Sequence, residues 1–140
     1  MNLFVVDSSV VIKWFVPETD TDVALRLQSG HPPLHSPDFL DVELAAIAWK
    51  KIRRDGMTRA DADFIVSKLP VLPIQKHPAI QLVHAAFDLA DRTNRSVYDC
   101  LYLALAVQLD GVMVTADEKL ANALSTTVWS MHIIKLQNIP

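Results

Sequence analysis

The chain has 140 residues, of which 51% are hydrophobic and only 3 are glycine, a composition that predicts one compact domain over 1–140 and argues against disorder. No apolar run is long enough to span a membrane, and the N-terminus lacks the basic segment and cleavage site of a signal peptide, so we expect no membrane association and a cytoplasmic location. The net charge of −3 disfavours a nucleic-acid partner only weakly, because drawing four of the 16 acids into one metal site would leave 13 Lys and Arg residues facing 12 acids.

The first predicted element is an apolar run near the N-terminus. Leu3 to Val6 contains no polar residue and is too short for a helix, which predicts a central strand of a parallel sheet, buried on both faces. Asp7 follows directly, and open α/β sheets bind their ligands at the carboxyl ends of their strands. Asp7 is therefore a candidate site residue, although Asp7 and Ser8 are also residue types that commonly do no more than turn the chain.

Helices and strands then alternate along the chain. Helical segments are predicted at 10–15, 19–29, 36–54, 58–69, 78–91, 96–109 and 119–124. Further strands are predicted at 34–35, 70–74, 112–115 and 131–136, the second of these at a sheet edge because it contains two prolines. The helix over 78–91 is expected to bury a face formed by Ile80, Val83, Phe87 and Ala90. The alternation predicts a doubly wound α/β domain with helices on both faces of the sheet.

The second candidate acid lies in the predicted helix over 36–54, which Ser36-Pro37-Asp38 opens with a capping serine and a proline at the first helical position. Glu43 falls on the apolar stripe of this helix, whose other members are Leu40, Leu44, Ile47 and Trp49. A carboxylate on such a stripe is costly unless it is paired or bound to a metal. The alternative is that Glu43 pairs with Lys50 or reaches solvent at the edge of the stripe.

The third candidate acid opens the predicted helix over 96–109. Every side chain from Cys100 to Val107 is apolar, which predicts a helix buried nearly all round. Asp99 is the only ionisable carboxylate in its first three turns, although Ser96 and Asp99 also fit a capping box, and the two roles can coexist. Cys100, the single cysteine, excludes an internal disulfide and is expected to be a buried small hydrophobe.

The fourth candidate acid follows the predicted strand over 112–115. Asp117 stands at the carboxyl end of that strand, as Asp7 does at the end of the first. The alternative is that Thr115 and Glu118 form a capping pair and Asp117 is only a favourable acid in the first turn of the next helix.

Four carboxylates that converge on one rim would repel one another and raise one another's pKa values. A hard divalent cation, Mg²⁺ or Mn²⁺, removes that conflict because it prefers oxygen ligands. Held by carboxylates and open to phosphate, such a cation activates water and stabilises the charge that develops on an attacked phosphodiester. The four acids therefore predict metal-dependent phosphodiester chemistry.

Four segments resemble the acidic motifs of PIN-domain ribonucleases, and most closely those of the VapC toxins of prokaryotic toxin–antitoxin pairs. They are VDSSV at 6–10, DVELA at 41–45, YDCLYLALA at 98–106 and VTAD at 114–117. The four occur in order along essentially the whole chain. One departure is the pair Ala45-Ala46, which stands where the family often has an asparagine shortly after the second acid.

The resemblance implies a five-stranded parallel sheet and an endoribonuclease that depends on Mg²⁺ or Mn²⁺. Asp7 and Asp99 would ligate the metal, and Glu43 and Asp117 would complete the catalytic site. The supporting residues would be Ser9, Thr115 and Glu118.

The resemblance also implies an RNA substrate, an antitoxin partner and a homodimer. Aromatic residues are frequent anchors of protein interfaces, and the candidates near helix surfaces are Trp14, Phe15 and Trp49. The basic residues that flank the acidic motifs are candidate phosphate contacts: Lys13, Lys50, Arg53, Arg54 and Arg95.

Two other classes of function fit part of the pattern. Among phosphoryl-transfer domains, haloacid-dehalogenase-like phosphatases need a second acid where Ser9 stands, and a receiver domain needs an acceptor Asp where the chain has Gln75 and Lys76. A non-catalytic binding or scaffold module would explain each acid as a helix cap, but it requires four separate coincidences.

Overall fold

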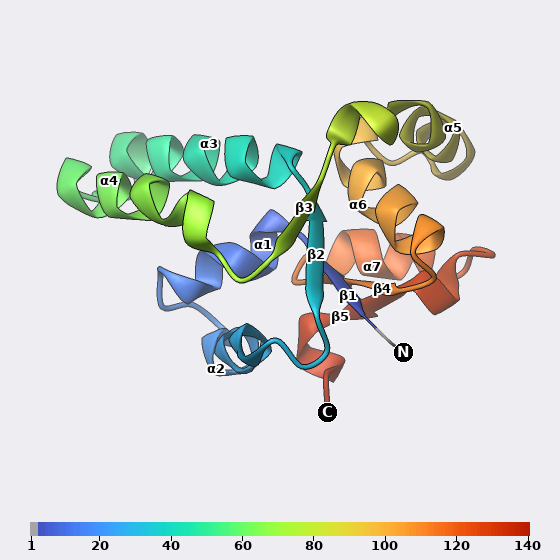
Figure 1. Cartoon of the computed structure of the whole chain (residues 1–140), viewed down its shortest axis with the longest axis horizontal. Coiled ribbons are helices and arrows are strands. Elements are labelled where there is room, and N and C mark those ends of the chain that lie inside the picture. The colour runs from blue at the N-terminus through green and yellow to red at the C-terminus, as the bar shows by residue number, and fades with distance from the viewer. Residues whose placement is uncertain (1–2) are drawn as a thin grey trace.

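The computed structural model describes residues 3–140 as a five-stranded, fully parallel sheet with the strand order β3-β2-β1-β4-β5 (Figure 1). The strands are β1 (Phe4–Val6), β2 (Leu34–Pro37), β3 (Gln75–His77), β4 (Val112–Thr115) and β5 (Ile133–Lys135). The helices are α1 (Ser8–Val11), α2 (Thr21–Arg26), α3 (Phe39–Arg54), α4 (Arg59–Lys68), α5 (Val83–Thr93), α6 (Val97–Gln108) and α7 (Glu118–Leu124). Met1 and Asn2, which the predicted domain over 1–140 includes, lie outside the described residues.

The first strand is central, as its sequence predicts. Val5 and Val6 are fully buried, and β1 pairs with β2 on one side and with β4 on the other. The chain runs outward from β1 through β2 to β3, and then returns to add β4 and β5 on the opposite side. The strand order therefore reverses between β1 and β4, and the carboxyl ends of these two strands form the switch point at which open α/β sheets bind ligands.

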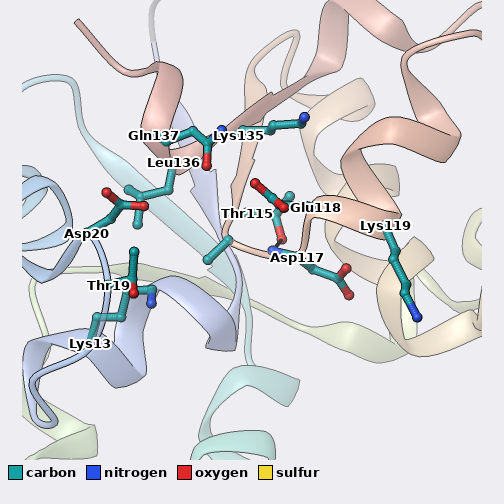
Figure 2. A pocket seen from close by; sticks show the side chains of 11 residues that line it. Lys13, Thr19, Asp20, Thr115, Asp117, Glu118, Lys119, Lys135, Leu136 and Gln137 are labelled. Atoms are coloured by element: carbon teal, nitrogen blue, oxygen red, sulfur yellow. Dashed lines mark hydrogen bonds between the residues drawn. The ribbon is translucent and has the colours of Figure 1, made fainter.

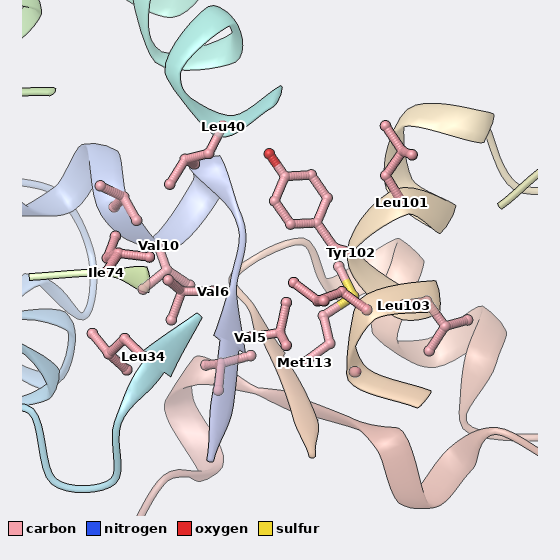
Figure 3. Close-up of a cluster of buried hydrophobic side chains, with 14 of the residues drawn as sticks. Val5, Val6, Val10, Leu34, Leu40, Ile74, Leu101, Tyr102, Leu103 and Met113 are labelled. Atoms are coloured by element: carbon pink, nitrogen blue, oxygen red, sulfur yellow. The ribbon is translucent and has the colours of Figure 1, made fainter. Parts of the chain in front are cut away.

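Helices cover the sheet on both faces, which confirms the predicted fold class. Val5 and Met113 face α6, whereas Val6 and Leu34 point to the opposite side, where Val10 of α1 packs (Figure 3). Helix α6 is buried at every position from Cys100 to Ala106 because it is packed between the sheet and α5. Within residues 3–140, none of the helices is both long enough and apolar enough to cross a bilayer.

Several element boundaries differ from the sequence prediction: α5 begins at Val83 and not at Pro78, because the chain first forms a 3-10 turn over 79–81, and β5 is limited to 133–135. The largest differences are at β2 and β3. Strand β2 continues through Pro37, so Ser36 is buried and donates to the Pro37 carbonyl instead of capping α3, which begins at Phe39. The third strand lies at 75–77 and not at 70–74, where the prolines lack the N–H groups that a ladder needs and the chain forms a short 3-10 turn. Its predicted position at the sheet edge is correct.

The buried faces of two helices also differ from the sequence prediction. Helix α5 packs through Ala86 and Leu89, together with its N-cap residue Leu82, which leaves Phe87 63% exposed, and Ile80 in the preceding 3-10 turn is 80% exposed. In α3 the small residue Ala48 faces inward, and Trp49 is 56% exposed. In both helices an alanine permits closer approach than the bulkier residue expected there, and apolar residues on more than one side make the periodicity ambiguous.

Candidate active site

Asp7 is the most buried of the four candidate acids, with 6% of its surface exposed. It ends β1 and caps α1, where its Oδ1 accepts the Val10 N–H at 3.3 Å. The Ser9 hydroxyl donates to Oδ1 at 2.5 Å, and the Thr115 hydroxyl donates to Oδ2 at 2.5 Å. Asp7 thus turns the chain and also anchors a polar cluster at the switch point.

The Asp7 carboxylate is held by neutral groups only. Burial raises the pKa of Asp7 to about 6, against the lowering effect of the hydrogen bonds from Ser9, Thr115 and Val10, and the charge of Glu43 raises it further. Within residues 3–140, Asp7 forms no ion pair with Lys, Arg or His. These three donors occupy three of the roughly four lone-pair sites of a carboxylate, so Asp7 retains capacity for a cation.

Ser9 and Thr115 join the loop after β1 to the loop after β4. The Ser9 Oγ accepts the Ala116 N–H at 2.9 Å, and the Thr115 Oγ1 accepts the Asp117 N–H at 3.1 Å. Asp117 itself caps α7, because its Oδ1 accepts the Leu120 N–H at 3.1 Å. The predicted capping pair of Thr115 and Glu118 is therefore wrong: the Thr115 hydroxyl is committed to Asp7, and Glu118 is the first residue of α7.

Glu43 projects from α3 and is half-buried. The Tyr102 hydroxyl of α6 donates to the Glu43 Oε1, and within the described residues Glu43 forms no ion pair with Lys50. Burial raises the pKa of Glu43, hydrogen bonds from Tyr102 and Ser8 lower it, and the charge of Asp99 raises it.

Tyr102 is a site residue that the sequence argument missed. It was counted with the apolar run of α6, but it lies three residues after Asp99, on the same helix face. A buried tyrosine hydroxyl usually finds a hydrogen-bond partner, and that rule was the available signal. Burial and the Glu43 charge raise the pKa of Tyr102, so its hydroxyl remains a donor.

One of the two hydrogen bonds of the predicted capping box is present at Asp99. Ser96 caps α6 by accepting the Asp99 N–H at 3.0 Å, but the Ser96 N–H does not donate to Asp99 in return within residues 3–140. Burial raises the pKa of Asp99, hydrogen bonding to Ser96 lowers it, the charge of Asp117 raises it and the charge of Arg95 lowers it. The cap therefore uses the backbone N–H of Asp99, while the Asp99 carboxylate, which also interacts with Ser96, lies near the charges of Asp117 and Arg95.

The four acids interact electrostatically in a chain. Asp7 is affected by the charge of Glu43, Glu43 by that of Asp99, and Asp99 by that of Asp117. Their oxygen-only donor set fits a hard divalent cation such as Mg²⁺ or Mn²⁺. Among residues 3–140, however, no three acidic, histidine or cysteine side chains form a ready-made metal cage, so metal binding would have to draw the carboxylates together.

A cavity of about 510 Å³ opens beside the acids, between the loop after β4, the end of β5 and the segment before α2 (Figure 2). It shares Thr115 and Asp117 with the acidic cluster, and Lys13 lines it. Of the other candidate phosphate contacts, Arg95 lies close enough to Asp99 to lower its pKa. Lys50, Arg53 and Arg54 lie at the far end of α3, and Arg53 stacks 5.8 Å above the Trp49 ring.

Comparison with known proteins places this architecture in a family. The PIN domain family model matches residues 4–123. Ribonuclease VapC3 of Pyrobaculum aerophilum is 31% identical over 126 residues, which span 89% of this chain and 96% of that protein.

Solved structures share the fold. The crystal structure of Mycobacterium tuberculosis VapC20, described as a Sarcin-Ricin loop cleaving toxin, has a TM-score of 0.63 at 16% identity and covers 86% of this chain and 94% of its own. A chain from a toxin-antitoxin complex of Klebsiella pneumoniae has a TM-score of 0.62 at 15% identity and covers 99% of this chain and 100% of its own. The family-model match and the Pyrobaculum relative show that this chain belongs to the PIN-domain family, among the VapC ribonucleases.

Proposed function

We propose that this protein is an endoribonuclease that depends on Mg²⁺ or Mn²⁺ and acts as the toxin of a toxin–antitoxin pair. The observation that carries the proposal is a buried, uncompensated Asp7 at the β1–β4 switch point, coupled to three further acids. The relatives add support, because they are named as VapC ribonucleases and one solved neighbour is described as a toxin that cleaves the sarcin-ricin loop. RNA is therefore the proposed substrate, and the cytosol the proposed place of action.

In this proposal each acid has a distinct task. Asp7 and Asp99 hold the cation, with Asp7 fixed by the Ser9 and Thr115 hydroxyls. Glu43 accepts the proton of the attacking water. Its raised pKa lies closer to neutral pH than the pKa of an ordinary carboxylate, which makes it a better proton acceptor at that pH. Asp117 completes the acidic cluster from the α7 cap, with Glu118 beside it.

The reaction is the hydrolysis of one phosphodiester. When bound, the cation would supply charge stabilisation at the phosphate and lower the pKa of water. The water oxygen attacks phosphorus, one of its protons passes to the Glu43 carboxylate, and one P–O ester bond breaks. The leaving oxygen takes up a proton from solvent, so the products are a phosphate monoester and a hydroxyl, and Glu43 later returns its proton to solvent. Tyr102 orients Glu43 by donating to it, so that the free lone pairs of Glu43 face the site.

Arg95 and Lys13 are the proposed phosphate contacts near the acids. The Arg95 charge lies close enough to Asp99 to lower its pKa, so the Arg95 guanidinium stands beside the acids, and its Nε is buried without a hydrogen-bond partner within the described residues. Lys50, Arg53 and Arg54 are seven to eleven residues beyond Glu43 along α3, roughly 10–16 Å at the helical rise. They are therefore proposed to contact more distant phosphates, if the bound RNA extends along α3.

We further propose an antitoxin partner and a homodimer. The α3–α4 pair presents an apolar groove of about 270 Å³ with Trp49 and Val66 at its sides, a shape that suits an amphipathic helix of the antitoxin. One structural neighbour is a toxin-antitoxin complex, which supports such a partner. For the homodimer the relevant surface is α5 with the 3-10 turn before it, where Ile80 of the turn and Val83 and Phe87 of the helix are exposed.

The function is tested by incubating the purified protein with end-labelled cellular RNA. Cleavage is expected with Mg²⁺ or Mn²⁺ and is expected to stop on addition of EDTA. Asp7→Asn and Asp99→Asn should each lower the cleavage rate by more than roughly 100-fold. Loss of a residue that only supports a metal ligand costs roughly 10–100-fold, and loss of a ligand itself should cost more.

The matched control is Asp63→Asn, because Asp63 is an exposed acid of α4 whose one ion pair within residues 3–140 is the exposed pair with Arg59. Its rate should equal that of the wild type. Cleavage that persists in EDTA, or that survives both site substitutions, would contradict the proposed metal-dependent nuclease.

A further inference from the structure

The cavity beside Asp117 continues the acidic cluster along the carboxyl rim of the sheet. Thr115 and Asp117 belong to both, and the opposite wall is formed by the end of β5 and by Leu136 and Gln137 of the short 3-10 turn η6 (Leu136–Asn138). Consecutive phosphates of a nucleic-acid strand are separated by one nucleoside. A chain whose scissile phosphate lies at the acids therefore places a neighbouring nucleotide over this cavity.

The cavity has the size and chemistry of a small-ligand site. Its volume of about 510 Å³ lies within the roughly 300–1,000 Å³ typical of such sites. Ala116 and Leu136 provide apolar surface, while Gln137 and Asp20 offer hydrogen-bonding groups to the edges of a base (Figure 2). Three lysines and three acids line the cavity, so its formal charges balance, and we do not expect it to attract every anion.

Lys13 is an unusual residue in this wall. Its side chain is only 10% exposed, and among the described residues its Nζ makes one long ionic contact, 3.4 Å, to the Glu18 carboxylate. Glu18 is shared with Lys51 at 3.5 Å, so it compensates neither ammonium fully. A nearly buried ammonium is costly without good partners, and the Lys13 amine points into the cavity (Figure 2).

Lys135 stands on the opposite wall. It is the last residue of β5 and is in register with Thr115 of β4, which brings it to the rim where the acids lie. Within residues 3–140 Lys135 forms no ion pair. Two ammonium groups thus flank one cavity, and neither has a short ionic contact.

We propose that this cavity holds one nucleotide of the RNA chain, adjacent to the scissile phosphate, and that Lys13 and Lys135 contact its phosphates. The inference rests on the proposed ribonuclease function and adds the residues that position the substrate. Lys13 and Lys135 are positioning residues here, since neither touches the scissile bond.

The first test locates binding without any cleavage. Each nucleoside 5′-monophosphate, and inorganic phosphate separately, is titrated into the metal-free, ¹⁵N-labelled protein. We expect the amides of 115–118 and 135–137 to shift with nucleotides at lower concentrations than with phosphate, and Lys135→Gln to abolish the effect. Absent shifts, equal shifts with phosphate alone, or shifts unchanged in Lys135→Gln would each overturn the nucleotide site.

The second test uses RNA. Binding of a labelled single-stranded 12-mer to the Asp99→Asn protein is measured by anisotropy over a range of salt concentrations. Lys135→Gln and Lys13→Gln should each reduce the slope of log K against log salt by about 0.7, the value for one lost phosphate contact on a single strand. Lys68→Gln removes the same charge on α4 and should leave the slope unchanged.

Equal slopes in all variants would refute the two lysine contacts. If Lys13→Gln fails to fold, Lys135→Gln still decides the question, because Lys135 is partly exposed and forms no ion pair in the part of the chain that the structure describes. Neither measurement requires catalysis. Failure of the proposed nuclease function would appear as absent cleavage, whereas failure of this inference would appear as absent binding in a protein that cleaves.

Discussion

Asp99 is the residue at which capping and site chemistry are most easily separated. Its backbone N–H satisfies the Ser96 cap, while its carboxylate lies near the charges of Asp117 and Arg95. A substitution that preserves shape but removes charge therefore acts almost wholly on the site.

We predict that Asp99→Asn leaves the metal-free protein as stable as the wild type, or more stable, because it relieves repulsion among the acids. Activity should be lost. Added Mg²⁺ should stabilise the wild type, by about 1.4 kcal/mol for each tenfold excess over its Kd, and the variant much less. Thermal melts with EDTA and with Mg²⁺ measure both effects.

Ser96→Ala is the complementary control, since it removes the cap and keeps the carboxylate. It should cost about 1 kcal/mol with or without metal and retain activity. A destabilised but fully active Asp99→Asn would show that Asp99 is only a helix-capping acid.

Tyr102 acts on the reaction through Glu43. Its hydroxyl lowers the pKa of Glu43 by hydrogen bonding to it. We predict that Tyr102→Phe moves the acidic limb of the kcat/KM–pH profile to higher pH and lowers activity at neutral pH by roughly 10-fold or more.

The control for Tyr102 is Tyr98→Phe on the same helix. Tyr98 is exposed and stacks on Phe39 at a centroid distance of 5.3 Å, and its hydroxyl has no hydrogen bond within the described residues. Its profile should match the wild type. A kcat/KM–pH profile that does not shift in Tyr102→Phe would contradict the proposed action of Tyr102 on Glu43.

At the scale of elements, α5 exposes large apolar side chains that its sequence predicts to be buried. Its buried side is formed by small or aliphatic residues that pack on α6, and its larger apolar residues face outward. Val83 and Phe87 are exposed four residues apart and therefore share one face of α5, and Ile80 is exposed in the 3-10 turn over 79–81 that precedes the helix. Exposed apolar surface of this kind marks interaction sites on small proteins, and we propose a second copy of the chain as its occupant.

We predict that Phe87→Asp shifts the protein from dimer to monomer at micromolar concentration, because a charge in the centre of an apolar interface must be desolvated. Sedimentation equilibrium measures the change. Phe64→Asp places the same charge on α4 and should leave the dimer intact. A wild type that is already monomeric at this concentration would contradict the proposed homodimer.

At the scale of the whole molecule, the buried carboxylates lower the free energy of unfolding at neutral pH. The pKa values of Asp7, Glu43 and Asp99 are all raised, first of all by burial. A carboxyl whose folded-state pKa is raised contributes stability below its unfolded pKa, and this contribution is lost as the pH rises through the folded value. For Asp7 that window runs from 3.8 to about 6.

We predict that the metal-free protein loses ~3 kcal/mol of unfolding free energy between about pH 4 and pH 6 through Asp7 alone. Urea unfolding in EDTA at several pH values measures this loss. Asp7→Asn should reduce the dependence of the unfolding free energy on pH over this window. Mg²⁺ at neutral pH should restore stability to the wild type. A wild-type stability that rises over this window would contradict an uncompensated Asp7.

The sequence by itself determined the strand pattern, the central place of β1 and the four acids. These follow from short-range signals: apolar runs of strand length, caps, and carboxylates where carboxylates are costly. The same signals misplaced β3, because the prolines at 70 and 73 mark a nearby edge without fixing the strand itself.

Only the tertiary structure decided how the acids are held and what surrounds them. The Thr115 hydroxyl reaches Asp7 across 108 positions of sequence, and Tyr102 reaches Glu43 across 59. The outward face of α5 and the cavity between Lys13 and Lys135 likewise arise from helix packing and strand register. No local pattern encodes such contacts, because they depend on which apolar face each helix buries and on which strands become neighbours.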